Sequence, residues 1–308
     1  MKRLWNLLLC LGLLFCVSEG WAQDLDQISL KRGLKVSGGL NFNNTFYNGS
    51  DSLIKRDPYQ MMLSGNLNFN LWGISLPFSF SYTNSTTTYT QPFNRFKLAP
   101  KYKWVKLHLI DGALNFSQYT LAGRQFRGAG VELTPGNWYV GAMYGRLAKA
   151  VEYDPMVDNL ETVAYKRMGY GLKVGYAAEK TDVNVTFFSA EDDVKSLKFD
   201  VPPEADLHPQ KNTAVSAYLR QSFLKYFYVQ AEYAFSVYNS EIRSESGDTV
   251  RSSNFIDKLF NKSGNDRYVD AVSASVGYQN PVWGVALCYE RVAPDYQTLG
   301  GYYFSNDL

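Results

Sequence analysis

The 308-residue chain has few of the side chains on which metal and thiol chemistry depends. It contains 2 His and 3 Cys, and Cys10 and Cys16 lie in an apolar N-terminal segment that we expect to be removed. The remaining Cys288 would then have no cysteine with which to form an internal disulfide. A zinc site of His and Cys ligands is therefore not expected. We expect neither a metal ion nor a cofactor.

The chain also lacks an excess of charge and, beyond its start, long apolar runs. Its formal net charge is +2, so no basic surface suited to nucleic acid is expected. After Gln23 no run of 18 apolar residues remains. That absence excludes a membrane protein built from spanning helices.

The N-terminus has the organisation of a targeting segment. Lys2 and Arg3 precede an apolar stretch from Leu4 to Val17, and Gly20-Trp21-Ala22 is a small-x-small cleavage sequence. We expect residues 1–22 to be a signal peptide and the exported chain to begin at Gln23. Residues 23–308 would then form one structural domain.

What the chain has in quantity is alternation of apolar and polar residues. From Tyr59 to Leu71, and again from Ile74 to Thr83 after Trp72-Gly73, one face is apolar and the other is mostly Asn and Ser. Side chains alternate across a strand with period two, and strands of about ten residues cross a bilayer when tilted. Thirteen candidate strands can be counted. Other clear examples are 34–46, 167–176, 182–187, 227–237, 272–278 and 283–290.

The connections between these strands alternate between short and long. Short connections are predicted at Trp72-Gly73, Asp111-Gly112, Pro135-Gly136-Asn137, Ala178-Glu179-Lys180, Leu224-Lys225 and Gln279-Asn280-Pro281. Long connections are predicted at 48–58, 84–97, 148–162, 190–211 and 239–267. The connection near Gly123 is short although it falls on the long side. Outer-membrane barrels have short periplasmic turns, longer extracellular loops and aromatic residues at both interfaces.

On this collective pattern the chain from Leu34 to Leu308 resembles an outer-membrane β-barrel protein, of the Bacteroidetes type with an Ala-Gln signal junction. The resemblance implies an all-β, antiparallel, up-and-down transmembrane β-barrel of porin-like or transporter-like kind, in the cell outer membrane of a Gram-negative bacterium. It also implies contact with outer-membrane lipid and lipopolysaccharide, and insertion by the barrel-assembly machinery. The alternative is a secreted sandwich or a soluble ligand-binding barrel, which would hide its apolar face.

The strand count bears on whether this barrel can close. Bacterial single-chain barrels have an even number of strands, and thirteen cannot close an antiparallel sheet. Residues 292–308 resemble the outer end of a descending strand that has barely begun. We therefore expect an incomplete barrel of 14 or more strands, lacking its C-terminal part, unless two chains close together.

The polar faces of the strands supply candidate lumen residues. Both signs of charge occur on them, so the charge of a solute is left open; the residues are Lys35, Lys173, Asp182, Arg220, Glu232 and Glu290. The stretch from Thr120 to Gly130 adds Arg124 and Arg127 among three glycines. It has two interpretations, an infolded pore constriction that favours anions or a short extracellular hairpin with arginines at its rim.

The two histidines give little sign of catalysis. Alternation places His108 with Lys106 on the lumen side, where a hydrogen-bonded structural histidine is expected. His208 follows Asp206 in a loop, and an acid/base pair as in omptin-like barrel proteases is one interpretation. Solvated loop residues explain the pair better. We therefore predict no catalytic residue and no enzymatic activity.

Two classes of function remain for such a barrel. A TonB-dependent transporter is excluded because residues 23–33 leave no room for a plug domain before the first strand. The leading interpretation is a pore or transport channel for small polar solutes. The alternative is a non-transport surface barrel that serves as an adhesin, a secretion-apparatus component or a surface hydrolase.

Overall fold

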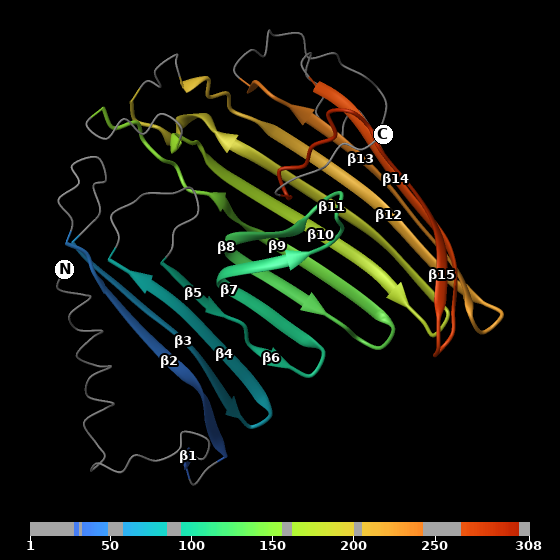
Figure 1. The fold of residues 1–308 in the computed structure, drawn as a ribbon, viewed down its shortest axis with the longest axis horizontal. Helices are drawn as coiled ribbons and strands as arrows, with labels where there is room; N and C mark the ends of the chain where they lie inside the picture. Colours follow the sequence, from blue (N-terminus) through green and yellow to red (C-terminus); the bar gives the residue numbers. More distant parts are fainter. Residues whose placement is uncertain are drawn as a thin grey trace.

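A computed structural model describes residues 28–30, 33–48, 58–84, 94–155, 162–199, 205–242 and 266–301. The expected signal peptide lies outside these ranges. Figure 1 shows one strongly curved sheet whose strands follow each other in chain order from the N-terminal to the C-terminal edge. Among the described residues, no helix has the length and apolarity to cross a membrane.

Every neighbouring pair of strands is antiparallel. The strands are β1 Ile28–Leu30, β2 Leu34–Phe46, β3 Tyr59–Leu71, β4 Ile74–Thr83, β5 Arg95–Leu98, β6 Lys101–Tyr102, β7 Val105–Asn115, β8 Ala122–Leu133, β9 Trp138–Ala148, β10 Lys166–Ala177, β11 Thr181–Asp193, β12 Lys211–Phe223, β13 Phe227–Asn239, β14 Asp266–Gln279 and β15 Gly284–Val292. A 3-10 turn, Val194–Ser196, follows β11. The predicted all-β, up-and-down architecture of an outer-membrane barrel is confirmed.

The register assigns the two faces of the sheet. Leu172 lies opposite Ala142 and Phe187 in the neighbouring strands, so apolar residues form continuous rows on the outer face. Large apolar side chains are exposed there, among them Leu40, Phe42, Tyr144, Tyr170, Leu172, Val185, Leu219, Tyr233, Val276 and Leu287. An outward apolar band of this kind is the surface that a membrane barrel presents to lipid.

Aromatic side chains gather near the ends of the strands. At the short turns the rings of Trp138 and Tyr176 are 5.2 Å apart, and those of Tyr278 and Trp283 are 5.0 Å apart. At the opposite ends Phe46 and Tyr59 have ring centroids 5.1 Å apart. These positions correspond to the two girdles that flank the apolar band of such barrels.

Two details differ from the sequence-based expectation. The thirteen predicted strands correspond to β2 through β15, with β5 and β6 forming one strand broken at Ala99 and Pro100, and β1 is an addition. The predicted turn at Asp111-Gly112 is wrong, because both residues lie inside β7. The turn is instead at Lys103 and Trp104, where Lys103 has a φ of 50°.

The two edges of the sheet are open within the described residues. There β1 pairs with β2 alone and β15 pairs with β14 alone. Both faces of β15 are exposed, and the side chain of Leu287 is 80% exposed to solvent. The expectation that further strands complete a barrel of 14 or more stays a prediction.

Candidate functional site, a hairpin folded onto the inner face

The upper part of the β7–β8 hairpin leaves the wall. β8 pairs with β9 only between Arg127 and Leu133, and the preceding residues of β8 pair with β7 alone. On the other side, β7 pairs with β5 only through Leu109 and Ile110. The hairpin tip, residues 116–121, lies in front of β10 and β11 in Figure 1. It is therefore folded onto the inner face.

Glycines make the departure of the hairpin sterically feasible. A Cβ added at Gly128 would lie 2.2 Å from the carbonyl oxygen of Tyr144, a contact with backbone that cannot move aside. At Gly141 and Gly171 an added Cβ would meet the ring of Phe116 at 3.0 and 2.8 Å. The absence of a side chain at Gly128 lets β8 approach the backbone of β9 closely at the bend. The absence of side chains at Gly141 and Gly171 makes room for the ring of Phe116.

The inner face beneath the tip is a row of small residues. The register aligns Thr186, Ser216, Ala234 and Ala271 across β11 to β14, and all four are buried. Small side chains leave a hollow in the face of a sheet, and the tip fills it. The Thr120 hydroxyl is 3.0 Å from that of Thr186, which is 2.9 Å from that of Ser216.

Charged inner-face residues hold the tip by hydrogen bonds. The Lys173 ammonium donates to the carbonyl oxygen of Phe116 at 2.7 Å, and the Tyr119 hydroxyl donates to the Glu290 carboxylate at 2.6 Å. The Ser117 hydroxyl donates to the Glu232 carboxylate. Three of the predicted lumen residues therefore contact the tip. Hydrogen bonds to charged groups contribute about 1.5 to 3 kcal/mol each.

The C-terminal segment 293–301 holds the tip from its other side. The Tyr296 hydroxyl donates to the carbonyl oxygen of Tyr119 at 2.7 Å, and the Thr298 hydroxyl donates to that of Thr120 at 2.7 Å. An apolar cluster lies between tip, segment and wall, and includes Leu121, Phe126, Leu147, Phe188 and Leu299. Tip and segment together fill part of the space inside the curved sheet.

A polar cavity of about 360 Å³ lies beside the tip, toward the short turns. Its lining comprises Phe116, Tyr139, Lys173, Asp182, Asn184, Tyr218 and Glu232. The Tyr139 hydroxyl donates to Asp182 at 2.6 Å, and Asn184 donates to that hydroxyl at 3.0 Å. Donors, acceptors and both signs of charge converge here. Such a lining suits a small polar solute better than an apolar ligand.

The remaining predicted site residues lie apart from this cavity or at its margin. Arg220 lies opposite Asp182 in the next strand, with its guanidinium carbon 4.7 Å from the centre of the Tyr228 ring. Lys35 lies opposite Asn70 near the N-terminal edge of the sheet. It is therefore part of the inner face but lies away from the hairpin tip.

The structure separates the two arginines expected at the constriction. Arg127 lies opposite Arg146, in the outward row that includes Tyr144, and forms an ion pair with Asp111 at 2.7 Å. Arg124 donates to the carbonyl oxygen of Gly301 at 3.1 Å. A pair of inward cations is not formed, because residues three apart along β8 point to opposite faces of the strand.

Both histidines are bound by carboxylates. His108 is buried on the inner face, where its Nε2 contacts Glu132, while Lys106 donates to the same carboxylate at 2.8 Å. His208 contacts Glu241 through Nδ1 and Asp206 through Nε2 at 3.0 Å. These contacts with carboxylate acceptors, the one with Glu241 above all, raise the pKa of His208.

The stretch from Thr120 to Gly130, for which the sequence left an infolded constriction and an extracellular hairpin open, includes the last two residues of the tip, but residues 116–119 and the surface beneath them were not singled out from the sequence. Their signal is indirect, because the row of small residues is visible only when the register of four strands is known. In the described part of the chain, no group of three or more His, Cys, Asp or Glu side chains is arranged to hold a metal ion.

Comparison with known proteins finds similarity only among solved structures. No protein-family model matches the chain, and no curated protein sequence matches it. OmpT, an outer membrane protein of Vibrio cholerae, is 13% identical with a TM-score of 0.38, over 89% of each chain. A mutant of the Rh. blastica porin is 10% identical with a TM-score of 0.30, over 84% of this chain and 94% of the porin. OccK5 of Pseudomonas aeruginosa is 8% identical with a TM-score of 0.25, over 86% and 93%.

At these identities the likeness concerns the fold alone. The prediction that the chain is not an enzyme is nevertheless wrong as an exclusion. The first of these structures, OmpT, is described as an outer membrane protein, and that description does not restrict it to a channel. The sequence-based exclusion of enzymatic activity is therefore withdrawn.

Proposed function

We propose that this protein is an outer-membrane pore for small polar solutes, in which the β7–β8 tip forms the constriction. The observation that carries the proposal is the tip itself, folded across the inner face and bordered by a polar cavity. A hairpin that narrows an aqueous lumen selects solutes by size and by the groups that line the passage.

The proposal includes the location and surroundings of the chain. Its outer apolar face and aromatic ends suit contact with outer-membrane lipid and lipopolysaccharide. Export through a signal peptide and insertion by the barrel-assembly machinery are parts of the same proposal, as is an origin in the Bacteroidetes.

Charge near the tip indicates which solutes pass most readily. Three carboxylates, Asp182, Glu232 and Glu290, border the tip and its cavity, together with Lys173 and Arg220. Two cations against three anions leave one negative charge. We propose that the passage favours neutral and cationic polar solutes over anions by a small factor.

The test is electrical and uses the full chain, folded and inserted into planar bilayers. Discrete conductance steps with a mild preference for cations are expected, and liposome swelling should admit small neutral sugars and exclude larger ones. A heat-modifiable, protease-resistant sample establishes that the inserted protein is folded. Folded protein that gives neither conductance steps nor sugar entry would refute the pore.

A further inference from the structure

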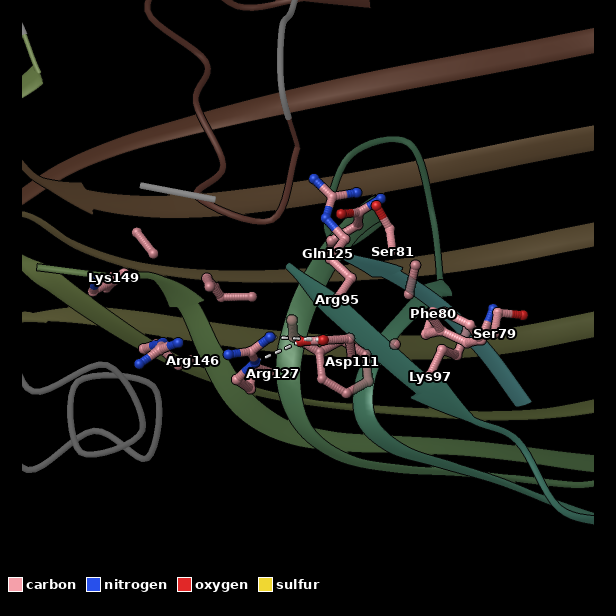
Figure 2. A pocket seen from close by; sticks show the side chains of 15 residues that line it. Ser79, Phe80, Ser81, Arg95, Lys97, Asp111, Gln125, Arg127, Arg146 and Lys149 are labelled. Carbon is pink, nitrogen blue, oxygen red and sulfur yellow. Dashed lines mark hydrogen bonds and ion pairs between the residues drawn. The ribbon is translucent and has the colours of Figure 1, made fainter. Parts of the chain in front are cut away.

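Where the β7–β8 hairpin leaves the wall, β5 and β9 are left facing each other across a gap. β9 continues through Leu147 and Ala148 beyond its last pair with β8, and β5 begins with Arg95 and Phe96 ahead of its first pair with β7. A cavity of about 250 Å³, which we call the wall cavity, occupies this place and is lined from β4, β5, β7, β8 and β9. Figure 2 shows Arg127 and Asp111 joined within it, between Arg146 and Lys149 on one side and Lys97 on the other.

Side chains replace part of the missing strand pairing at this gap. The Asp111 carboxylate accepts a hydrogen bond from the backbone N–H of Phe96 at 2.8 Å, and Arg127 donates to the backbone carbonyl of Asn94 at 2.9 Å. Arg127 also holds both oxygens of Asp111, at 2.7 and 2.8 Å. Unpaired backbone groups are costly in a membrane-spanning sheet. The gap is thus stabilised by specific contacts and is a built feature of the wall.

The wall cavity is apolar within and cationic at its margin. Apolar lining comes from Phe80, Ala113, Phe126, Leu147 and Ala148. The cationic lining comprises Arg95, Lys97, Arg127, Arg146 and Lys149. Asp111 is the one acidic residue of the lining, and it is paired with Arg127. Five cations less one carboxylate leave four positive charges around an apolar space.

The position of Arg146 and Lys149 at the end of β9 corresponds to the interface region of a membrane barrel. Tyr144 is exposed on the outer face of β9, and Arg146 follows it by two residues in the direction of the long connections. Aromatic residues mark the interfaces of membrane barrels. Arg146 and Lys149 therefore lie at the level of lipid head groups, where a negative charge can approach them from the side of the membrane.

We propose that the wall cavity binds an amphiphile with a single acyl chain and an anionic head group, either carboxylate or phosphate. The acyl chain occupies the apolar interior, and Arg146, Lys149 and Lys97 bind the head group. An engineered apolar cavity of about 150 Å³ accommodates benzene, so 250 Å³ accommodates several methylene groups of such a chain. This site is independent of solute passage through the lumen.

The test compares three probes by calorimetric titration of the folded full chain in a non-ionic detergent. Dodecanoate is expected to bind saturably, and dodecyltrimethylammonium and inorganic phosphate at least tenfold more weakly. Replacing Arg146→Gln together with Lys149→Gln should weaken dodecanoate binding at least tenfold, and Ala113→Phe should abolish it by filling the cavity. Lys225→Gln, at a short turn on the opposite side of the membrane, is the matched control and should change nothing.

The natural source of the amphiphile is distinguished in a second arm. Organic extracts of protein purified from membranes are examined by mass spectrometry, and a fatty acid or a lipid phosphate identifies which head group is carried. Equal binding of the anionic and cationic probes would overturn the proposal, as would phosphate binding as tight as that of dodecanoate, or no saturable binding at all. The comparison of probes on the unaltered chain decides the matter even where a variant fails to fold.

Discussion

The ammonium of Lys173 lies 2.7 Å from the carbonyl oxygen of Phe116 and joins β10 to the hairpin tip. The same side chain lines the polar cavity with Asp182 and Glu232. Lys173 therefore anchors the hairpin tip and balances the charge of the carboxylates beside it. Its neighbour Leu172, on the opposite face, is exposed.

The two faces of β10 should respond differently to substitution. Leu172→Arg places a cation in the lipid-facing band and should cost about 2 to 4 kcal/mol if the site lies near the bilayer midplane. Lys173→Gln, its matched partner, removes the ammonium that donates to Phe116 but places no charge in lipid, so its folding yield should fall less than that of Leu172→Arg. Folding yields in liposomes measure both, and equal yields would contradict the assignment of faces.

Removing the aromatic anchor of the tip should widen the passage. Tyr119 is 1% exposed and packs against Tyr296, Ala234 and Ala271. Tyr119→Ala should loosen the tip by about 3 to 5 kcal/mol, by analogy with large-to-small changes in cores, and should raise single-channel conductance. Gln118→Ala, at the exposed neighbouring position, is the control. Unchanged conductance for Tyr119→Ala would show that the tip does not restrict flow.

The bend of the hairpin should depend on one glycine more than on others. Gly128→Ala would place a Cβ 2.2 Å from the Tyr144 carbonyl oxygen, whereas Gly39 has no heavy atom within 4 Å of an added Cβ. Overpacking typically lowers the free energy of unfolding by about 1 to 3 kcal/mol. A clash with backbone, which cannot move aside, should cost an amount at the upper end of that range. The heat-modifiable form should therefore be depleted in Gly128→Ala and retained in Gly39→Ala. Equal yields would mean that β8 and β9 separate more readily than the structure indicates.

The outer loop contact of His208 should depend on pH. Hydrogen bonds that the ring donates to the carboxylates of Glu241 and, to a smaller extent, Asp206 raise its pKa above the ordinary value of 6.5. A raised pKa means that the contact stabilises the fold fully below pH 6.5, and that this contribution is lost as the pH rises through the folded-state pKa. Glu241→Gln should lower the pKa of His208, as followed by NMR of the imidazole, and Asp206→Asn should lower it less. If the pKa of His208 is the same in Glu241→Gln as in the unaltered chain, the contact between His208 and Glu241 is contradicted.

Most of the wall follows from local sequence, because alternation with period two is a property of neighbouring residues. It predicts the inward direction of Lys173, Asp182 and Glu232, which the structure places at one cavity. It fails at Asp111-Gly112, a dipeptide with the composition of a turn. The Asp111 carboxylate instead accepts hydrogen bonds from the Arg127 side chain and from the backbone N–H of Phe96. These partners are 16 and 15 residues away in the sequence.

The contacts that hold the hairpin tip could not be predicted, although the sequence offered an infolded hairpin at 120–130, because the contacting residues are distant in sequence. Tyr119 contacts Glu290 and Tyr296 across 171 and 177 residues. The floor of the tip consists of Thr186, Ser216, Ala234 and Ala271, each an unremarkable small residue in its own strand. They become a surface only in the register that aligns them.

That distance in sequence sets an order of events during biogenesis. The β7–β8 hairpin can form as soon as its own residues are available, but its docking surface exists only after β11 to β14 have paired. Contacts separated by so many residues form late, since the intervening chain must first be ordered. The newly inserted sheet therefore passes through a stage in which its interior is unobstructed. We therefore expect closure of the interior to be the last step of its maturation.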